Sequence, residues 1–259
     1  MQRIYHIYFC LILILVLLYP ENSSANRLIL ATDDGPPHMI KETDGGIDID
    51  IVKKVLNQIG YDIDIIYVPL ERAKLMVSEN KADVFIPTFF QPDDKNIYLS
   101  DPVISYKPMV FSLKSNNVSY KSISDLKNLS IVTFQGASGY FGKEFAKLSQ
   151  KSDYQELHNM AKFPELLLKE RYEVVILDFY IFYYFLKKQL ENNKAQYAYK
   201  EIASFALIPE VKAYAGFNDK VLRDNFNQQL SLFQQAKSDQ KIIEYYIGPV
   251  DSLVNVNSF

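Results

Sequence analysis

The sequence predicts an α/β protein built from two similar halves and a helical C-terminal part. Strand-like and helix-like segments alternate from residue 27 to residue 87, and a comparable alternation returns from residue 124 to residue 192. Strands separated by helices indicate a mainly parallel sheet with helices on its faces. We therefore expect one such sheet in each half.

The first half begins with a short strand at residues 27–32 (RLILAT), which ends in a Gly-Pro-Pro loop. Residues 47–60 carry apolar side chains at helical spacing and end at Gly60, a residue type that commonly terminates helices. A strand, a second helix and a third strand follow at residues 61–69, 70–81 and 82–87.

The second half repeats this order after a short helical segment. One strand ends at Gly136, and a helix begins near Ser138. A further helix, strand and helix follow at residues 163–172, 173–178 and 179–192. The aromatic residues 179–185 have helical spacing, so we expect a buried helix there. Apolar residues at helical spacing in the C-terminal part predict a long amphipathic helix with a break, over residues 219–248.

The first 25 residues have the features of a secretory signal peptide. Arg3 precedes a mostly apolar stretch at residues 4–18, and Ser23-Ser24-Ala25 is a small-residue cleavage site. The alternative is an uncleaved membrane anchor, although the stretch is short for a bilayer span of roughly 20 residues. Cys10 lies early in the stretch, which argues against lipid attachment there. Cleavage after Ala25 predicts a periplasmic protein.

After cleavage we expect a nearly neutral protein without disulfides. Cys10 is the only cysteine, and the formal net charge is −3. About 230 residues suffice for one large domain or for two lobes that are held by hydrophobic cores. A nucleic-acid partner would need a basic face, so this class of partner is not expected.

The ligand site is expected at the carboxyl ends of the strands, where open parallel sheets bind their ligands. The segments predicted at these ends are Asp33-Asp34, residues 69–72, Pro87-Thr88, residues 135–138 and Asp178. Two sheets that face each other would line a cleft with these segments.

Several motifs, in their order and spacing, resemble the bacterial extracellular solute-binding proteins of family 3. The motifs are GGIDIDIVKKVLNQIGYDIDI, ENKADVFIPTF, IYLSDPV, SISDLKNLSIVTFQGASGY and KERYEVVILD. Each is weak alone, but together they extend the resemblance over essentially the whole chain after residue 25.

The resemblance implies a two-lobed clamshell of the type II periplasmic-binding-protein class. Lobe one would comprise residues 26–113 and 211–259, and lobe two residues 114–210. Members of the family capture a small polar solute, such as an amino acid, and close around it. They then deliver it to the permease of an ABC importer in the inner membrane. We expect a monomer that needs no cofactor.

The resemblance also implies roles for residues of lobe two. Family members bind the ammonium group of an amino acid with carboxylates, and its carboxylate with an arginine and backbone N–H groups. Asp178 matches the ammonium-binding aspartate, but it also stands where a helix N-cap is expected. Ser138 follows Gly136 at a helix start, where free N–H groups form either an anion site or a plain cap. Tyr140 is a further candidate contact.

Lobe one lacks the arginine that many amino acid binders carry in the loop after residue 88. Counting back seven residues from Ser100 gives Asp93, and the nearest cation is Lys95. A lysine does not provide the bidentate clamp of a guanidinium group. Arg72, in VPLERAK, is the replacement we expect; the alternative is a surface arginine that pairs with Glu71 or another acid.

Other candidates in lobe one lie near the strand ends. Thr88 and Phe89 offer a hydroxyl group and a stacking face. Asp33, Asp34 and His38 lie in the loop TDDGPPHM, and His38 stands where a subgroup of the family has an aromatic residue. Its imidazole could stack, form hydrogen bonds or titrate with pH, and the alternative is an exposed loop histidine.

The sequence favours a protein that is not an enzyme. His38 and His158 lie far apart with no metal-ligand spacing, and no cysteine nucleophile or Gly-x-Ser-x-Gly motif follows residue 25. A few relatives of this fold are periplasmic dehydratases, and in such an enzyme Asp33, His38 or Asp178 would act as acid or base. Another alternative is a sensor subunit that presents its ligand-bound form to a membrane receptor.

Overall fold

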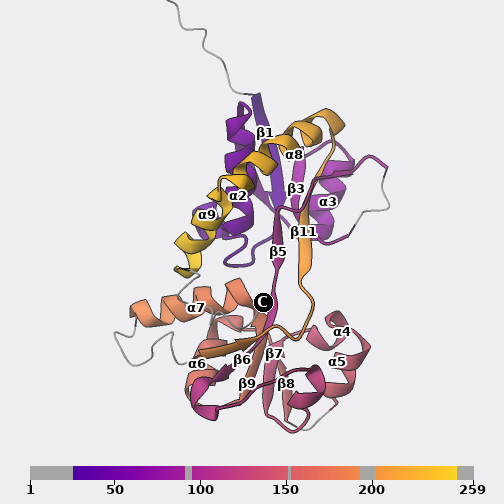
Figure 1. Cartoon of the computed structure of the whole chain (residues 1–259). Coiled ribbons are helices and arrows are strands. Elements are labelled where there is room, and N and C mark those ends of the chain that lie inside the picture. The colour runs from indigo at the N-terminus through magenta and orange to yellow at the C-terminus, as the bar shows by residue number, and fades with distance from the viewer. Residues whose placement is uncertain (1–25, 91–94, 151–152, 193–201, 250–259) are drawn as a thin grey trace, which may run out of the picture.

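The computed structural model describes residues 26–90, 95–150, 153–192 and 202–249. Its named strands form two sheets, one in each of two lobes (Figure 1). The α/β prediction with two sheets is confirmed. Residues 1–25, where we expect a signal peptide, lie outside the described ranges. Among the helices in those ranges, none combines the length and the apolar character of a membrane span.

The first sheet has the strand order β2-β1-β3-β11-β4, and β5 pairs with β11. Strands β2, β1 and β3 are parallel, as the alternation of strands and helices predicts, whereas β11 runs antiparallel to β3, β4 and β5. All residues of β3 are buried, as expected for a central strand. The strands are β1 (Asn26–Thr32), β2 (Tyr61–Tyr67), β3 (Val84–Thr88), β4 (Tyr98–Leu99), β5 (Ile104–Tyr106) and β11 (Val211–Phe217).

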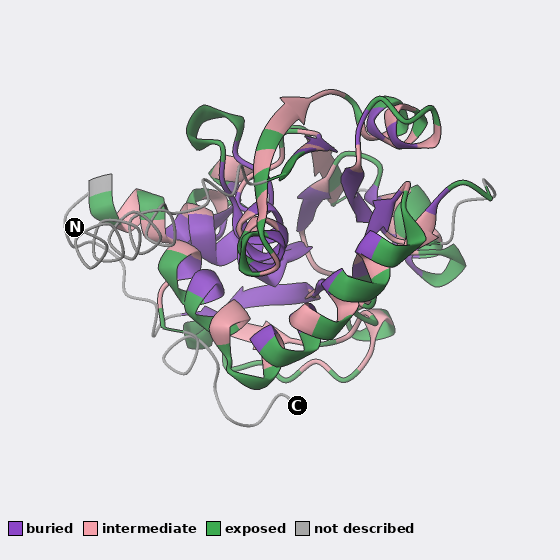
Figure 2. Cartoon of the chain, turned by 90° about the horizontal axis from the view of Figure 1, so that it is seen from above, coloured by how far each residue is buried: buried purple, intermediate pink, exposed green. Residues whose placement is uncertain are grey.

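Helices pack around the first sheet with their apolar sides inward. In α2, the predicted apolar positions Ile47, Ile51, Val55 and Leu56 are fully buried. Figure 2 shows the same division in other helices, which are exposed on their outer sides and buried toward the strands. These helices are α2 (Ile47–Gln58), α3 (Leu70–Ser78), α8 (Lys220–Gln235) and α9 (Ser238–Ile247), with a 3-10 helix, η1, at Lys41–Thr43.

The second sheet has the strand order β10-β6-β9-β7-β8. Strands β8, β7 and β9 are parallel, and β6 runs antiparallel to both β9 and β10. The strands are β6 (Pro108–Leu113), β7 (Ile131–Phe134), β8 (Tyr154–Leu157), β9 (Val174–Asp178) and β10 (Ile202–Phe205).

The aromatic helix α7 (Phe179–Asn192) is part of the core, as its sequence predicts. Phe182 stacks on Phe111 of β6 with ring centroids 3.8 Å apart, and both Phe182 and Tyr183 are fully buried. The other helices of this part of the chain are α4 (Ala137–Tyr140), α5 (Lys143–Leu148) and α6 (Phe163–Leu168), with 3-10 helices η2 (Lys114–Asn116), η3 (Ile123–Leu126) and η4 (Met160–Lys162).

In the described part of the chain, two connections cross between the sheets. Lys107 links β5 to β6, and residues 206–210 link β10 to β11. Because β5 pairs with β11, with Tyr106 opposite Val211, the two crossing segments form a two-stranded ribbon. The pairing of β6 corrects one expectation: residues 108–113 belong to the second sheet, although the sequence analysis assigned them to lobe one. The chain therefore enters the second lobe near Lys107.

Candidate functional site

A buried cluster of charged side chains lies between the two lobes. His38, in the loop after β1, stands between Asp48 of α2 and Asp178 at the end of β9. Its Nδ1 lies 2.7 Å from Oδ1 of Asp48, and its Nε2 lies 3.4 Å from Oδ1 of Asp178. His38, Asp48 and Asp178 are 1%, 0% and 7% exposed. One imidazole thus joins the two lobes.

The loop that carries His38 is fixed against the first turn of α2. The N–H of Ile47 donates to the carbonyl of Pro37 at 2.8 Å, and the N–H of Asp48 donates to the carbonyl of His38 at 3.0 Å. These bonds satisfy N–H groups that have no partner inside the helix. Gly46 permits the close approach, since a Cβ atom there would lie 2.3 Å from the carbonyl oxygen of His38.

Tyr106, in the crossing ribbon, covers one side of the cluster. Its ring stacks on the imidazole of His38 with centroids 3.8 Å apart, and its hydroxyl donates to Oδ2 of Asp48 at 2.8 Å. Phe89 packs edge-on against Tyr106 at 5.0 Å. Burial raises the pKa of the Tyr106 phenol, and the charge of Asp48 raises it further, so the hydroxyl stays protonated.

Asp178 accepts hydrogen bonds from three backbone N–H groups. Its Oδ1 accepts from Tyr180 and Ile181 at 2.8 and 3.1 Å, and its Oδ2 accepts from Lys107 at 2.6 Å. The first two bonds cap the N-terminus of α7, which is one of the two roles that the sequence left open. Contact between Asp178 and a ligand stays a prediction, and His38 already adds a further partner to this carboxylate.

His38 is a buried cation at neutral pH. Burial alone would lower the pKa of the imidazole, but the charges of Asp48 and Asp178 and the hydrogen bonds to them outweigh burial and raise it to about 9. The alternative of an exposed loop histidine is wrong, because the side chain is enclosed by α2, the ribbon and the start of α7.

We predict that the protein loses stability as the pH rises from 6.5 through 9. The pKa of His38 is about 9 in the folded protein and 6.5 without its partners. The folded state therefore holds this proton more tightly, and the stabilisation is complete below pH 6.5 and lost above pH 9. Urea titrations across this range should show a fall of up to about 3 kcal/mol in the free energy of unfolding. A constant free energy of unfolding over this pH range would contradict the raised pKa of His38 in the folded protein.

A second carboxylate site lies in lobe two, at the start of α4. Oε2 of Glu156 accepts the N–H of Gly136 at 2.7 Å, and Oε1 accepts the N–H of Ser138 at 2.8 Å and the hydroxyl of Tyr154 at 2.7 Å. Partial burial opposes ionisation of Glu156, but these hydrogen bonds outweigh it and lower the pKa of the carboxyl to about 2. The N–H groups that we expected to meet an anionic ligand thus bind a carboxylate of the chain itself.

The sequence analysis missed Glu156, Asp48 and Tyr106 because their roles depend on pairing between distant segments. Glu156 lies opposite Thr133, since β8 runs parallel to β7. Neighbouring parallel strands end at the same edge of a sheet, so the end of β8 reaches the loop after β7. The signal that could have revealed Glu156 is a strand at residues 154–157, which the sequence analysis did not predict.

Tyr140 and Thr88 have different surroundings. The ring of Tyr140 is 50% exposed and packs edge-on against Phe134 with centroids 6.0 Å apart. Burial raises the pKa of the Tyr140 phenol, and the charge of Asp178 across the loop raises it further. Thr88 is buried, and its hydroxyl donates to the carbonyl of Phe90 at 3.1 Å. Tyr140 therefore has an accessible ring within the electrostatic reach of Asp178, whereas the hydroxyl of Thr88 bonds within its own loop.

The predicted acids of the first loop shape that loop. Oδ1 of Asp33 accepts the N–H of Asp34 at 2.8 Å, and Oδ1 of Asp34 accepts the N–H of Lys41 at 3.0 Å. Contact of either residue with a ligand stays a prediction.

The structure does not bring the predicted cations into the cluster. Arg72 is exposed in the first turn of α3, and Glu71, the acid expected beside it, lies 3.9 Å from Lys74 instead. Lys95 is also exposed, and Asp93 lies outside the described residues. A role for Arg72 or Lys95 toward a solute remains a prediction.

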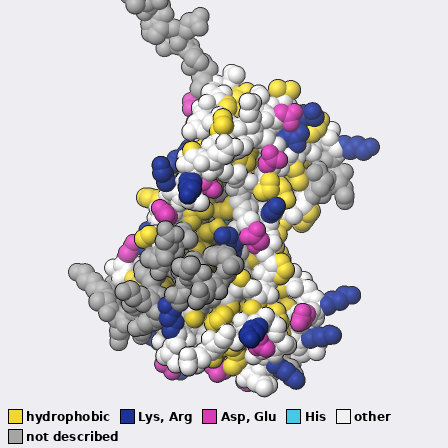
Figure 3. All heavy atoms as spheres, viewed as in Figure 1, with side chains coloured by type: hydrophobic (Ala, Val, Ile, Leu, Met, Phe, Trp, Pro, Cys, Tyr) yellow, Lys and Arg dark blue, Asp and Glu magenta, His cyan; other side chains and the backbone are white. Residues whose placement is uncertain are grey.

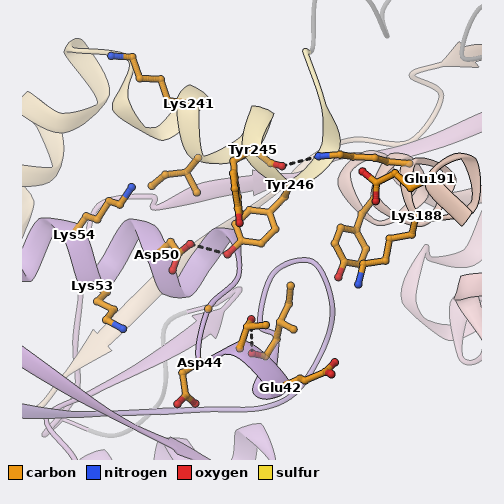
Figure 4. Close-up of a pocket in the computed structure, with 16 residues that line it drawn as sticks. Glu42, Asp44, Asp50, Lys53, Lys54, Lys188, Glu191, Lys241, Tyr245 and Tyr246 are labelled. Atoms are coloured by element: carbon orange, nitrogen blue, oxygen red, sulfur yellow. Dashed lines mark hydrogen bonds between the residues drawn. The ribbon is translucent and has the colours of Figure 1, made fainter.

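A separate cavity of about 820 Å³ lies between α2, α7 and α9 (Figure 4). Its floor includes a hydrogen bond of 2.7 Å from the hydroxyl of Tyr246 to Asp50. None of the residues that we predicted from the sequence lines this cavity. Charges of both signs border it, so it has no clear preference for an anion or a cation: Lys53, Lys54, Lys187, Lys188 and Lys241 face Glu42, Asp44, Asp50 and Glu191.

The cluster holds charge but has no free base. Both ring nitrogens of His38 face carboxylates, and Asp178 is held by backbone N–H groups. Within the described ranges, no three His, Cys, Asp or Glu side chains are grouped so that they could hold a metal ion. The cluster therefore couples the two lobes through paired charges.

The sequence profile of the bacterial extracellular solute-binding proteins, family 3, matches residues 28–249. The chain belongs to this family. No curated protein sequence matches the chain. Membership of family 3 agrees with the two sheets and the crossing ribbon, and it confirms the family that the motifs indicated.

Solved structures show the same fold. An ancestral cationic amino acid solute-binding protein matches with a TM-score of 0.68 and 18% identity, over 88% of this chain and 98% of that one. The L-cystine solute receptor of Neisseria gonorrhoeae, unliganded and open, matches with a TM-score of 0.66 and 15% identity, over 90% and 97%. A histidine kinase sensor domain with similarity to periplasmic binding proteins matches with a TM-score of 0.58 and 12% identity, over 86% and 96%. The type II fold is therefore confirmed for this member of family 3.

Proposed function

We propose that the chain captures a small polar solute, an amino acid or a related compound, in a cleft between the lobes and delivers it to an ABC importer. The observation that carries this proposal is the ribbon of β5 and β11, which joins the lobes beside a charged cluster with members in both. A solute that touches both lobes binds the closed arrangement better and shifts the chain toward it. Membership of family 3 supports the proposal.

The cleft that we propose is lined by rings near the ribbon. Tyr106 and Phe89 pack together on the side of lobe one, and we place Tyr140 of lobe two across the cleft from them. In Figure 3, hydrophobic side chains gather at the waist of the molecule between the two lobes. We place the solute between these rings, with the buried cluster beneath it. Secretion through the predicted signal peptide would place this binding protein in the periplasm, as a monomer.

A second candidate is a sensor subunit whose ligand-bound form acts on a membrane receptor. The similarity to a histidine kinase sensor domain supports it. In both candidate functions the chain binds a solute in the same cleft. They differ in the membrane partner that binds the closed form. Pull-down of an importer permease by the liganded chain, and not by the free chain, would support delivery.

Calorimetric titration of the purified chain tests the proposed function. The chain would first be unfolded and refolded to remove any solute carried from the cells. The panel holds the twenty amino acids, common polyamines and small organic acids, and each mixture is analysed for products. We expect at least one compound to bind with a micromolar or lower Kd and to be recovered unchanged. Conversion of a bound compound would instead make the cleft an enzyme site, and no binding by any compound would count against the proposal.

Tyr140→Ala should weaken binding of that compound by about tenfold, because the half-exposed ring is the contact that lobe two offers across the cleft. Its melting temperature should stay close to that of the unaltered chain. Tyr245→Ala is a matched control, since Tyr245 is 74% exposed on α9. Equal affinities for the two variants would remove Tyr140 from the site.

A further inference from the structure

We propose that the solute of this cleft is an organic amine without an α-carboxylate. This inference rests on the proposed function and narrows it. It starts from the side chain of Glu156, which occupies backbone N–H groups at the start of α4 that could otherwise bind a solute carboxylate.

Glu156 is built into this position. Its two oxygens accept from Gly136, Ser138 and Tyr154 at 2.7 to 2.8 Å. The parallel pairing of β8 with β7 holds the side chain at the end of the sheet, directly beside the loop that begins α4. A solute carboxylate at the same N–H groups would have to displace Glu156, or lie against it as a second negative charge.

Among the described residues, the cations beside the cluster are already engaged: Lys107 of the ribbon, whose backbone N–H donates to Asp178, has a further interaction partner. The imidazole of His38 already lies between Asp48 and Asp178. Among the described residues, Arg72 and Lys95 are exposed and have no contact with this cluster. A desolvated carboxylate needs a counter-charge or several donors, and the donors at His38, Gly136 and Ser138 are already bonded to carboxylates of the chain.

The cleft is better matched to a cation. Asp48, Asp178 and, in lobe two, Glu156 exceed the protonated His38 and the adjacent Lys107 by one negative charge. Phe89 and Tyr106 pack together beside the cluster, Tyr140 presents a half-exposed ring in lobe two, and aromatic faces attract ammonium groups. An amine with an alkyl or aromatic body satisfies both features.

Matched pairs of compounds test the inference directly. Cadaverine, agmatine, histamine and tyramine differ from lysine, arginine, histidine and tyrosine only by the loss of the carboxylate. Calorimetric titration of the purified chain should show at least one amine that binds about a hundredfold or more tightly than its parent amino acid.

Glu156→Gln distinguishes the effect of the negative charge of Glu156 from the effect of the size of its side chain. The variant keeps the size of the side chain but removes its negative charge from the N–H groups of Gly136 and Ser138. We expect the parent amino acid to gain about tenfold or more in affinity and the amine to lose affinity. Glu173→Gln is the matched control, because Glu173 accepts the N–H of Ser130 at 2.9 Å in the same lobe, before β7 rather than after it. This control should leave both affinities unchanged.

Three outcomes would overturn the inference. An amino acid that binds the unaltered chain as tightly as its amine would contradict the amine preference while it supports the proposed function. If Glu156→Gln kept the same selectivity for the amine over its parent amino acid, Glu156 would not be the cause of that selectivity. A chain that binds neither series, nor any compound of the wider panel, would contradict the proposed function and the amine preference together.

Discussion

His38→Ala should reduce the free energy of unfolding at pH 7 by about 3–5 kcal/mol, because it leaves Asp48 and Asp178 buried without their cation. Removing one partner of a buried charge pair lowers the free energy of unfolding by more than the intact pair contributes to it. The reason is that the remaining charges stay buried, away from water and without a counter-charge. Urea unfolding followed by circular dichroism measures the effect. The variant should also lose the fall in stability that we expect between pH 6.5 and 9.

His158→Ala is the control for this substitution, because His158 is exposed on the second lobe. Its unfolding midpoint should match that of the unaltered chain. Asp48→Asn in the His38→Ala background should restore part of the loss by removing one buried charge. A loss below about 1 kcal/mol for His38→Ala would show that the cluster is not the counter-charged unit described here.

Gly46→Ala should destabilise the fold by about 2–3 kcal/mol or more and weaken solute binding. The backbone of Gly46 has a φ of +126°, and a Cβ atom there would lie 2.3 Å from the carbonyl oxygen of His38. Relief of this clash would move the loop away from α2 and separate His38 from Asp48. Thermal and urea unfolding of the variant measure the loss.

Comparison with Gly60→Ala distinguishes the effect of the clash at residue 46 from the effect of backbone strain. Gly60 also has a positive φ, of +93°, but no atom lies within 4 Å of its ideal Cβ position. This variant should lose about 1 kcal/mol and retain solute affinity. Equal losses for Gly46→Ala and Gly60→Ala would show that contact with His38 does not require a glycine at residue 46.

Local patterns were sufficient to predict the main helices and the strands β1, β2, β3, β7 and β9, but not the strands β4, β5, β6, β8, β10 and β11. The helical spacing of residues 47–60 and the buried strand at 173–178 correspond to α2 and β9. The boundary between lobes was misplaced by six residues, since residues 108–113 are as apolar as a strand of either sheet, and only their pairing partners decide the assignment.

The candidate site was predictable only in part. His38 and Asp178 were identified from their positions in the motifs, but the contact between them joins segments that are 140 residues apart in the chain. The charge on His38 follows from that contact and from Asp48, so the histidine alone could not reveal it. For Glu156 the local signal, a strand at residues 154–157, is not enough by itself, because the role of this residue depends on the register between β8 and β7.

Small-angle X-ray scattering tests the central claim, that a solute bound between the lobes closes them about the ribbon of β5 and β11. The purified chain would be measured alone and with a saturating amount of the solute that calorimetry identifies. We predict a smaller radius of gyration in the liganded sample, because closure brings the lobes together. An unchanged radius of gyration at full saturation would contradict closure of the lobes around the solute.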